Sequence, residues 1–228
     1  MDRVLERLVA TTVGMRNGVS ALLVAAGVVF AAVACSPLVS RAPQTAFFDF
    51  GLMEATDVSV SLSSLPVEVV APSWLSGSAM QYRLAWKQPE RRRSYSESRW
   101  VAPPPDMLAQ TLGRALSATN GNKIDDKAAA RCRLRVELDE FVQVFDSESE
   151  NHVQLVIRAQ LLPVRGSVAM AGREFSLIER GTTPDAEGGV TAARAAVRGL
   201  ARDIAAWLDG LDRLPKSGAN GVARCSSV

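Results

Sequence analysis

Two long stretches in which apolar and polar residues alternate are the most regular feature of the chain. Apolar side chains recur at every second position of both, which is the pattern of a strand with one buried face. A polar turn at 146–151 separates them, so the pattern predicts a long antiparallel hairpin. Glu140 interrupts the apolar face of the first stretch, as a β-bulge would. The predicted apolar positions are Cys132, Leu134, Val136, Leu138, Val142 and Val144, followed by Val153, Leu155, Ile157, Ala159 and Leu161.

Shorter segments of similar pattern predict further strands. They cover 47–52, 65–70 and 80–86, and a strand pair within 168–178 would turn near Gly172. The stretch 89–93 has the sequence Pro-Glu-Arg-Arg-Arg, which predicts a charged turn.

Helical spacing of apolar residues occurs in two segments. In the first, a Pro-rich start at 103–105 and Asp106 precede Leu108, Leu112 and Leu116. The second begins near Glu187, ends before Pro215 and carries three arginines opposite its apolar stripe. The stripe consists of Ala193, Val197, Leu200, Ile204, Trp207 and Leu211. We therefore predict a single α+β domain in which an antiparallel sheet has two main helices packed on one face.

The N-terminal region carries an export pattern. Arg16 introduces an apolar run from 19 to 34 that is too short for a comfortable membrane span, and Ala-Val-Ala directly precedes Cys35. The pattern resembles the lipobox of bacterial lipoproteins, with Ala32 where Leu is commoner. This resemblance implies cleavage after Ala34 and acylation of Cys35, which would anchor the chain to a membrane. Met15 would be the start of a more compact signal.

The chain accordingly divides into four parts. Residues 1–34 form the signal peptide, 35–46 the lipidated cysteine and a tether, 47–214 the folded domain and 215–228 a disordered tail. Ser36 follows the lipidated cysteine, and lipoprotein sorting in many Gram-negative bacteria passes Ser at this place to the outer membrane. We therefore expect the periplasmic face of the outer membrane as the location.

Composition excludes some classes of partner. The net charge of +2 over 228 residues gives no strong field that would favour nucleic acid. The mature length suits one domain with a real core. Besides Cys35, Cys132 lies on an apolar strand face and Cys225 in a polar tail. These contrasting places argue against a disulfide between them, although an oxidising compartment would permit one.

The sequence predicts no catalytic site and no cofactor site. His152 is the single histidine and lies on the polar side of its strand, so neither a nucleophile–base pair nor a set of zinc ligands is expected. No phosphate-binding loop occurs. The stretch 120–126 resembles a calcium loop only faintly, because Arg131 stands where a bidentate Glu would be needed.

Two features are candidates for contact with a partner or a membrane. Arg91, Arg92 and Arg93 would be exposed if they form a turn, and they suit an acidic surface or anionic lipid. Trp74 lies in the short loop 73–77, whereas core packing accounts for Trp86, Trp100 and Trp207. A solvated turn is the alternative interpretation of the three arginines.

The segment 80–116 resembles the hallmark stretch of the ABC-type transport auxiliary lipoprotein family. It has a Tyr-Arg strand, a Pro turn, a Tyr-containing strand, an Arg-Trp pair and a Pro-led helix, in this order. These residues are Tyr82, Arg83, Pro89, Tyr95, Arg99, Trp100 and 103–108. The opening Phe48-Asp49-Phe50, the segment 67–75 and a closing helix that ends in Trp207 extend the resemblance. We expect the motif residues to be structural.

The resemblance implies a non-enzymatic lipoprotein of a lipid-trafficking system. Its partners would be an MCE-domain periplasmic protein and, indirectly, an ABC permease and ATPase, and a homo-oligomer would fit the same role. Two alternatives stay open: an outer-membrane biogenesis or cell-wall-binding lipoprotein, which gene neighbourhood would distinguish, and a periplasmic enzyme, which the single histidine argues against.

Overall fold

A computed structural model describes residues 44–52, 65–117, 131–212 and Cys225. These residues belong to one unit, Gln44–Val228. The predicted signal, Cys35, Ser36, the tether up to residue 43 and the calcium-like stretch 120–126 lie outside the described residues.

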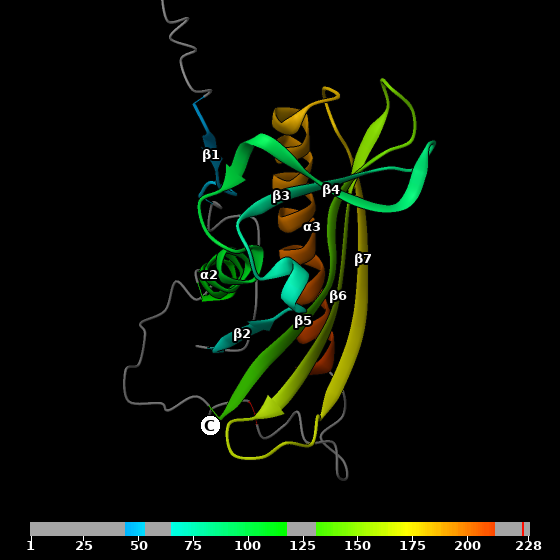
Figure 1. The fold of residues 1–228 in the computed structure, drawn as a ribbon. Helices are drawn as coiled ribbons and strands as arrows, with labels where there is room; N and C mark the ends of the chain where they lie inside the picture. Colours follow the sequence, from blue (N-terminus) through cyan, green and yellow to red (C-terminus); the bar gives the residue numbers. More distant parts are fainter. Residues whose placement is uncertain (1–43, 53–64, 118–130, 213–224, 226–228) are drawn as a thin grey trace, which may run out of the picture. The chain divides into compact units, whose positions relative to one another are not determined.

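The described part of the chain contains one mixed seven-stranded sheet, two helices and a 3-10 helix (Figure 1). The strands are β1 (Ala46–Phe48), β2 (Val67–Val70), β3 (Ala79–Leu84), β4 (Gln88–Trp100), β5 (Cys132–Phe145), β6 (Asn151–Pro163) and β7 (Ala171–Arg180). The helices are α2 (Pro104–Ser117) and α3 (Ala186–Asp212), and η2 (Ser73–Leu75) is the 3-10 helix.

The predicted α+β class is confirmed, and the sheet contains parallel as well as antiparallel pairs. Its order is β1-β4-β3-β5-β6-β7, and β2 pairs with the first half of β5. The pairs β1/β4, β2/β5 and β3/β5 are parallel. The predicted hairpin is β5 and β6, whose antiparallel register runs from Cys132 opposite Pro163 to Phe145 opposite Asn151.

The bulge predicted at Glu140 is present, and it corrects the assignment of the residues that follow it. The register passes from Leu138 opposite Ile157 to Glu140 opposite Val156, so Asp139 is the extra residue. Because side chains alternate along a strand, one extra residue exchanges the two faces. Phe141, Gln143 and Phe145 therefore face the core, and Val142 and Val144 lie on the opposite side from Leu138.

Two other strand predictions are wrong. Gly172 is not a turn but pairs with Gln160 within the single strand β7, and the chain turns instead at 164–170. The stretch 89–93 is not a turn either, since all its residues belong to β4. The backbone of this stretch pairs with β3. Charged residues can occupy such a strand as long as their side chains reach solvent or a counter-ion.

Both helices bury an apolar stripe. In α2, Leu108, Leu112 and Leu116 are buried at the predicted spacing. Helix α3 packs against β6 and β7, and α2 packs against β2 and α3 (Figure 1). Asp185 caps α3: its Oδ1 accepts the Gly188 amide at 2.8 Å, and this hydrogen bond lowers the pKa of the carboxyl group. None of the helices in the described ranges is long and apolar enough to cross a membrane.

The absence of a Cys132–Cys225 disulfide, expected from the sequence, is contradicted. The two residues are bonded across a sequence separation of 93. Cys132 begins β5, where the apolar face reaches the end of the sheet, and Cys225 packs against that end of the core. The polar composition of the tail did not indicate this contact.

Candidate functional site

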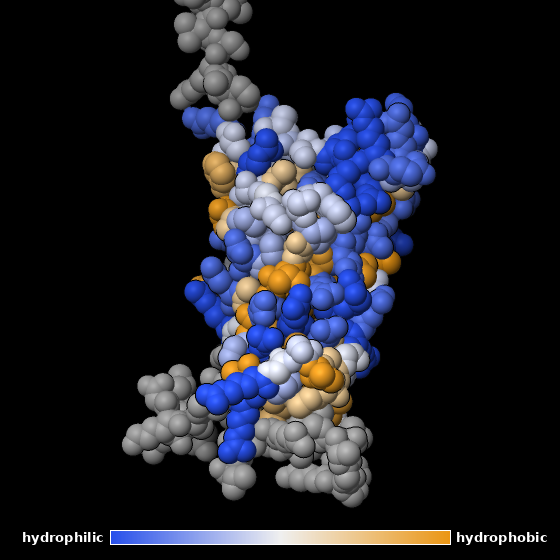
Figure 2. Space-filling model, turned by 60° about the horizontal axis from the view of Figure 1, so that its bottom comes forward, coloured by the Kyte–Doolittle hydropathy of each residue, from blue (hydrophilic) through white to orange (hydrophobic). Residues whose placement is uncertain are grey.

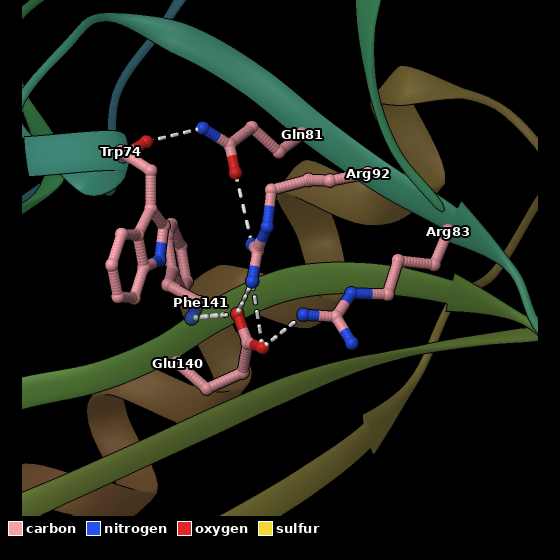
Figure 3. A network of polar contacts seen from close by, with 6 residues as sticks. All are labelled: Trp74, Gln81, Arg83, Arg92, Glu140 and Phe141. Atoms are coloured by element: carbon pink, nitrogen blue, oxygen red, sulfur yellow. Dashed lines mark hydrogen bonds and ion pairs between the residues drawn. The ribbon is translucent and has the colours of Figure 1, made fainter. Parts of the chain in front are cut away.

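A carboxylate shared by two arginines is the centre of a polar cluster on the sheet (Figure 3). Glu140 Oε2 lies 2.7 Å from Arg83 Nη2, and both oxygens of Glu140 lie 2.9 Å from Arg92 Nη2. The Phe141 amide also donates to Glu140 Oε1 at 3.0 Å. The Glu140 side chain is only 17% exposed, so these contacts replace most of its hydration.

The cluster follows from strand register. Arg83 of β3 lies directly opposite Arg92 of β4, and like charges in this position repel each other. The bulge in β5 places Glu140 beside both guanidinium groups, because β5 pairs with β3 on this side. The carboxylate thus compensates one of the two positive charges, and the cluster keeps a net charge of +1.

Trp74 is tied to this cluster through Gln81. The Gln81 side-chain amide donates to the Trp74 carbonyl oxygen at 2.6 Å, and Arg92 Nη1 donates to Gln81 Oε1 at 2.9 Å. Trp74 belongs to η2 and is 56% exposed, while its neighbour Leu75 is buried. Figure 3 shows the indole on the same side of the strands as Arg92 and Glu140. We call Trp74, Gln81, Arg83, Arg92 and Glu140 the Trp74 surface.

The three consecutive arginines do not form one patch, because they lie in a strand. Arg92 turns toward Glu140, whereas Arg91 and Arg93 both reach Gln88 Oε1, at 3.4 and 2.9 Å. Arg91 is exposed, and the other two are half-buried. The prediction of a contiguous exposed triplet is therefore wrong, and only Arg92 joins Trp74.

Trp86 also departs from its prediction. It was expected in the core, but it is 47% exposed in the turn between β3 and β4, where Lys87 Nζ lies 5.6 Å from its ring centroid. Strand β3 ends at Leu84, so the alternation of apolar and polar residues runs past the end of the strand, and Trp86 lies in the turn.

Of the remaining motif residues, Trp100 and Trp207 are buried, and Tyr82, Tyr95 and Arg99 are half-buried. Trp100 packs against Phe50 and Phe141, with ring centroids 5.4 and 5.6 Å apart. The rings of Tyr82 and Tyr95 are 4.8 Å apart. Arg99 Nη1 donates to the carbonyl oxygens of Tyr95 and Ser98. Trp207 lies on α3 against Phe175, at 6.0 Å.

A buried polar group joins the sheet to the start of α3, and the sequence analysis missed it. Gln143 accepts from the Tyr95 hydroxyl at 2.9 Å and donates to Asn151 Oδ1 at 2.7 Å and to the Asp185 carbonyl at 3.0 Å. Burial raises the pKa of Tyr95, so this hydroxyl remains a donor. The alternation pattern did not predict this buried position of Gln143, because the bulge moves Gln143 to the core face.

No residue group in the described ranges has the arrangement of a metal site. His152 Nδ1 lies 2.7 Å from Asp146 Oδ2 on the surface. Trp74 and Arg92, linked through Gln81, place an exposed aromatic side chain beside a positively charged group on the described surface.

The sequence profile of the ABC-type transport auxiliary lipoprotein component family matches residues 56–205. The chain belongs to this family. Two crystal structures show the same fold. The first is a DUF330-family protein of Xanthomonas campestris, with a TM-score of 0.60 and 15% identity, and the match covers 72% of this chain and 95% of that one. The second is an uncharacterised protein with a TM-score of 0.54 and 14% identity, and the match covers 72% of this chain and 99% of that one. No curated protein matches the chain.

Membership makes the chain an auxiliary lipoprotein component of ABC-type transport. Such a component acts beside the transporter, which agrees with a surface suited to recognition. The face seen in Figure 2 is largely hydrophilic, with apolar surface in separate small patches.

Proposed function

We propose that this chain is anchored by Cys35 to the periplasmic face of the outer membrane and docks the MCE-domain protein of an ABC-type lipid transport system. The observation that carries the proposal is the family match over residues 56–205. The export pattern that ends at Cys35, and Ser36 after it, support the anchor and its location. The chain acts by recognition and leaves ATP hydrolysis to its partners.

The Trp74 surface is the proposed docking site. The Trp74 backbone is held by the hydrogen bond from Gln81, so binding through the exposed indole orders little additional backbone, and Trp and Arg are enriched among residues that dominate binding energy. The surface carries a net charge of +1, so it suits an acidic rim on the partner.

Co-purification from solubilised envelopes tests the proposed partner. The full chain should retain an MCE-domain protein together with permease and ATPase. Recovery of cell-wall material without any transport component would support the alternative of a cell-wall-binding lipoprotein. Fatty-acid labelling and sucrose-gradient fractionation test the anchor, since Cys35→Ala should lose acyl incorporation and Ser36→Asp should shift part of the pool to the inner membrane.

Two tryptophans provide a matched test of the docking site. Trp74→Ala should weaken binding of the MCE-domain protein by tenfold or more, on the order of a hot-spot residue. Trp86→Ala removes a similarly exposed indole from another turn and should leave binding unchanged. Equal binding by both variants would exclude the Trp74 surface, and added salt should weaken the wild type if the acidic rim is correct.

A further inference from the structure

An apolar surface separate from the Trp74 surface lies where the chain enters the folded domain. Phe47 is 65% exposed, Leu52 82% and Val101 54%. Strand pairing brings Phe47 and Val101 close together: Phe47 of β1 lies beside Arg99, and the Val101 amide donates to the Phe48 carbonyl oxygen at 2.9 Å. Leu52 and Val101 also line one groove. We call Phe47, Leu52 and Val101 the N-terminal apolar surface.

The groove beside this surface has an apolar floor. Its volume is about 270 Å³, and buried Phe50 and Met107 lie among its lining residues. Its two charged lining residues are Asp49 and Arg114. The Asp49 carboxylate accepts the Gly51 amide at 2.7 Å, and Arg114 is exposed near the end of α2. The charges balance, so a ligand here would be held mainly by apolar contact.

The length of the tether indicates what this surface meets. Phe47 follows Cys35 by twelve residues, and an extended residue spans at most about 3.6 Å, so Phe47 stays within roughly 43 Å of the anchor. Among the exposed large apolar residues of the described ranges, Phe47 is joined to Cys35 by the shortest stretch of chain. An anchor at Cys35 therefore gives Phe47 the highest effective concentration at the bilayer among these residues, because effective concentration falls as a flexible connection lengthens.

We propose that the N-terminal apolar surface rests on the bilayer that carries the anchor, with Phe47 and Leu52 inserted into the interfacial region. This inference rests on the proposed lipidation of Cys35. An aromatic and two aliphatic side chains gain free energy in this region, and the contact needs no positive field. The groove then receives part of an acyl chain, and Arg114 meets a lipid phosphate.

The contact can be measured with tryptophan quenching in the full lipidated chain. The protein is reconstituted into vesicles of phosphatidylethanolamine and phosphatidylglycerol, with brominated phosphatidylcholine as the quencher. Phe47→Trp adds an indole at the proposed contact, and Val168→Trp adds one at the exposed turn between β6 and β7, where the native side chain is 79% exposed. The parent protein gives the background from the native tryptophans.

The added emission at position 47 should be lost in brominated vesicles, whereas that at position 168 should remain. If the chain floats with the vesicles but quenching occurs at position 168 alone or at neither position, the proposed contact is refuted and the proposed anchor is not. A chain that does not float refutes the anchor and the contact together. If Phe47→Trp does not fold, Leu52→Trp reports on the same surface.

Discussion

Replacing Glu140 by Gln should reveal how strongly the arginine pair depends on its carboxylate. The change keeps the size of the side chain and removes the charge that Arg83 and Arg92 share at 2.7 and 2.9 Å. The two guanidinium groups then face each other across adjacent strands without compensation. The cluster lies in β3, β4 and β5, so the loss acts on the middle of the sheet.

The expected loss of unfolding free energy is about 2 kcal/mol. Two charge-assisted contacts contribute about 3 kcal/mol at the lower end of their usual range, which suits arginines that keep partial contact with water. The glutamine oxygen recovers about 1 kcal/mol by accepting one neutral hydrogen bond. For a domain of this size, such a loss lowers the melting temperature by roughly 4–8 °C.

Urea unfolding of the unit Gln44–Val228 is the appropriate assay, with Asp139→Asn as the matched control. Asp139 is the neighbouring residue of the same bulge and bonds the exposed Arg158 through both carboxylate oxygens, so this change should cost no more than about 1 kcal/mol, as is usual for exposed ion pairs. A Glu140→Gln variant as stable as Asp139→Asn would refute the reasoning that partial burial makes this carboxylate structurally important.

Two other predictions concern the ends of the domain. Cys225→Ser should lower the unfolding free energy by about 2–5 kcal/mol, because a link across 93 residues constrains the unfolded chain. A reductant should lower the stability of the wild type and leave that of this variant unchanged. Equal urea midpoints for the two proteins without reductant would contradict the prediction. The pKa of Asp185 is lowered in the folded state, so its charge stabilises the domain above the unfolded pKa, and this contribution is lost as pH falls through the folded pKa. The stability difference between wild type and Asp185→Asn should therefore shrink in urea titrations below about pH 4, and a constant difference would show that the charge is irrelevant.

The spacing of apolar residues predicted most of the helices and strands correctly, because such an element forms where neighbouring residues place their apolar side chains on one face. The alternation in β6 and the helical stripe of α2 each reflect one buried face, and both lie where the pattern places them. The family resemblance also rested on short-range order of motif residues, and the match over 56–205 confirms it. The lipidation and sorting residues, Cys35 and Ser36, remain predictions.

The sequence alone determined that the chain has an α+β fold, a bulge at Glu140 and membership in a transport-associated family. Only the tertiary structure decided which side chains share a surface. It directed Arg92 away from Arg91 and Arg93, joined Arg92 to Trp74 through Gln81, moved Gln143 into the core and bonded Cys132 to Cys225. These contacts depend on register between strands and on packing across distant segments, and a single bulge exchanges the faces of every residue after it.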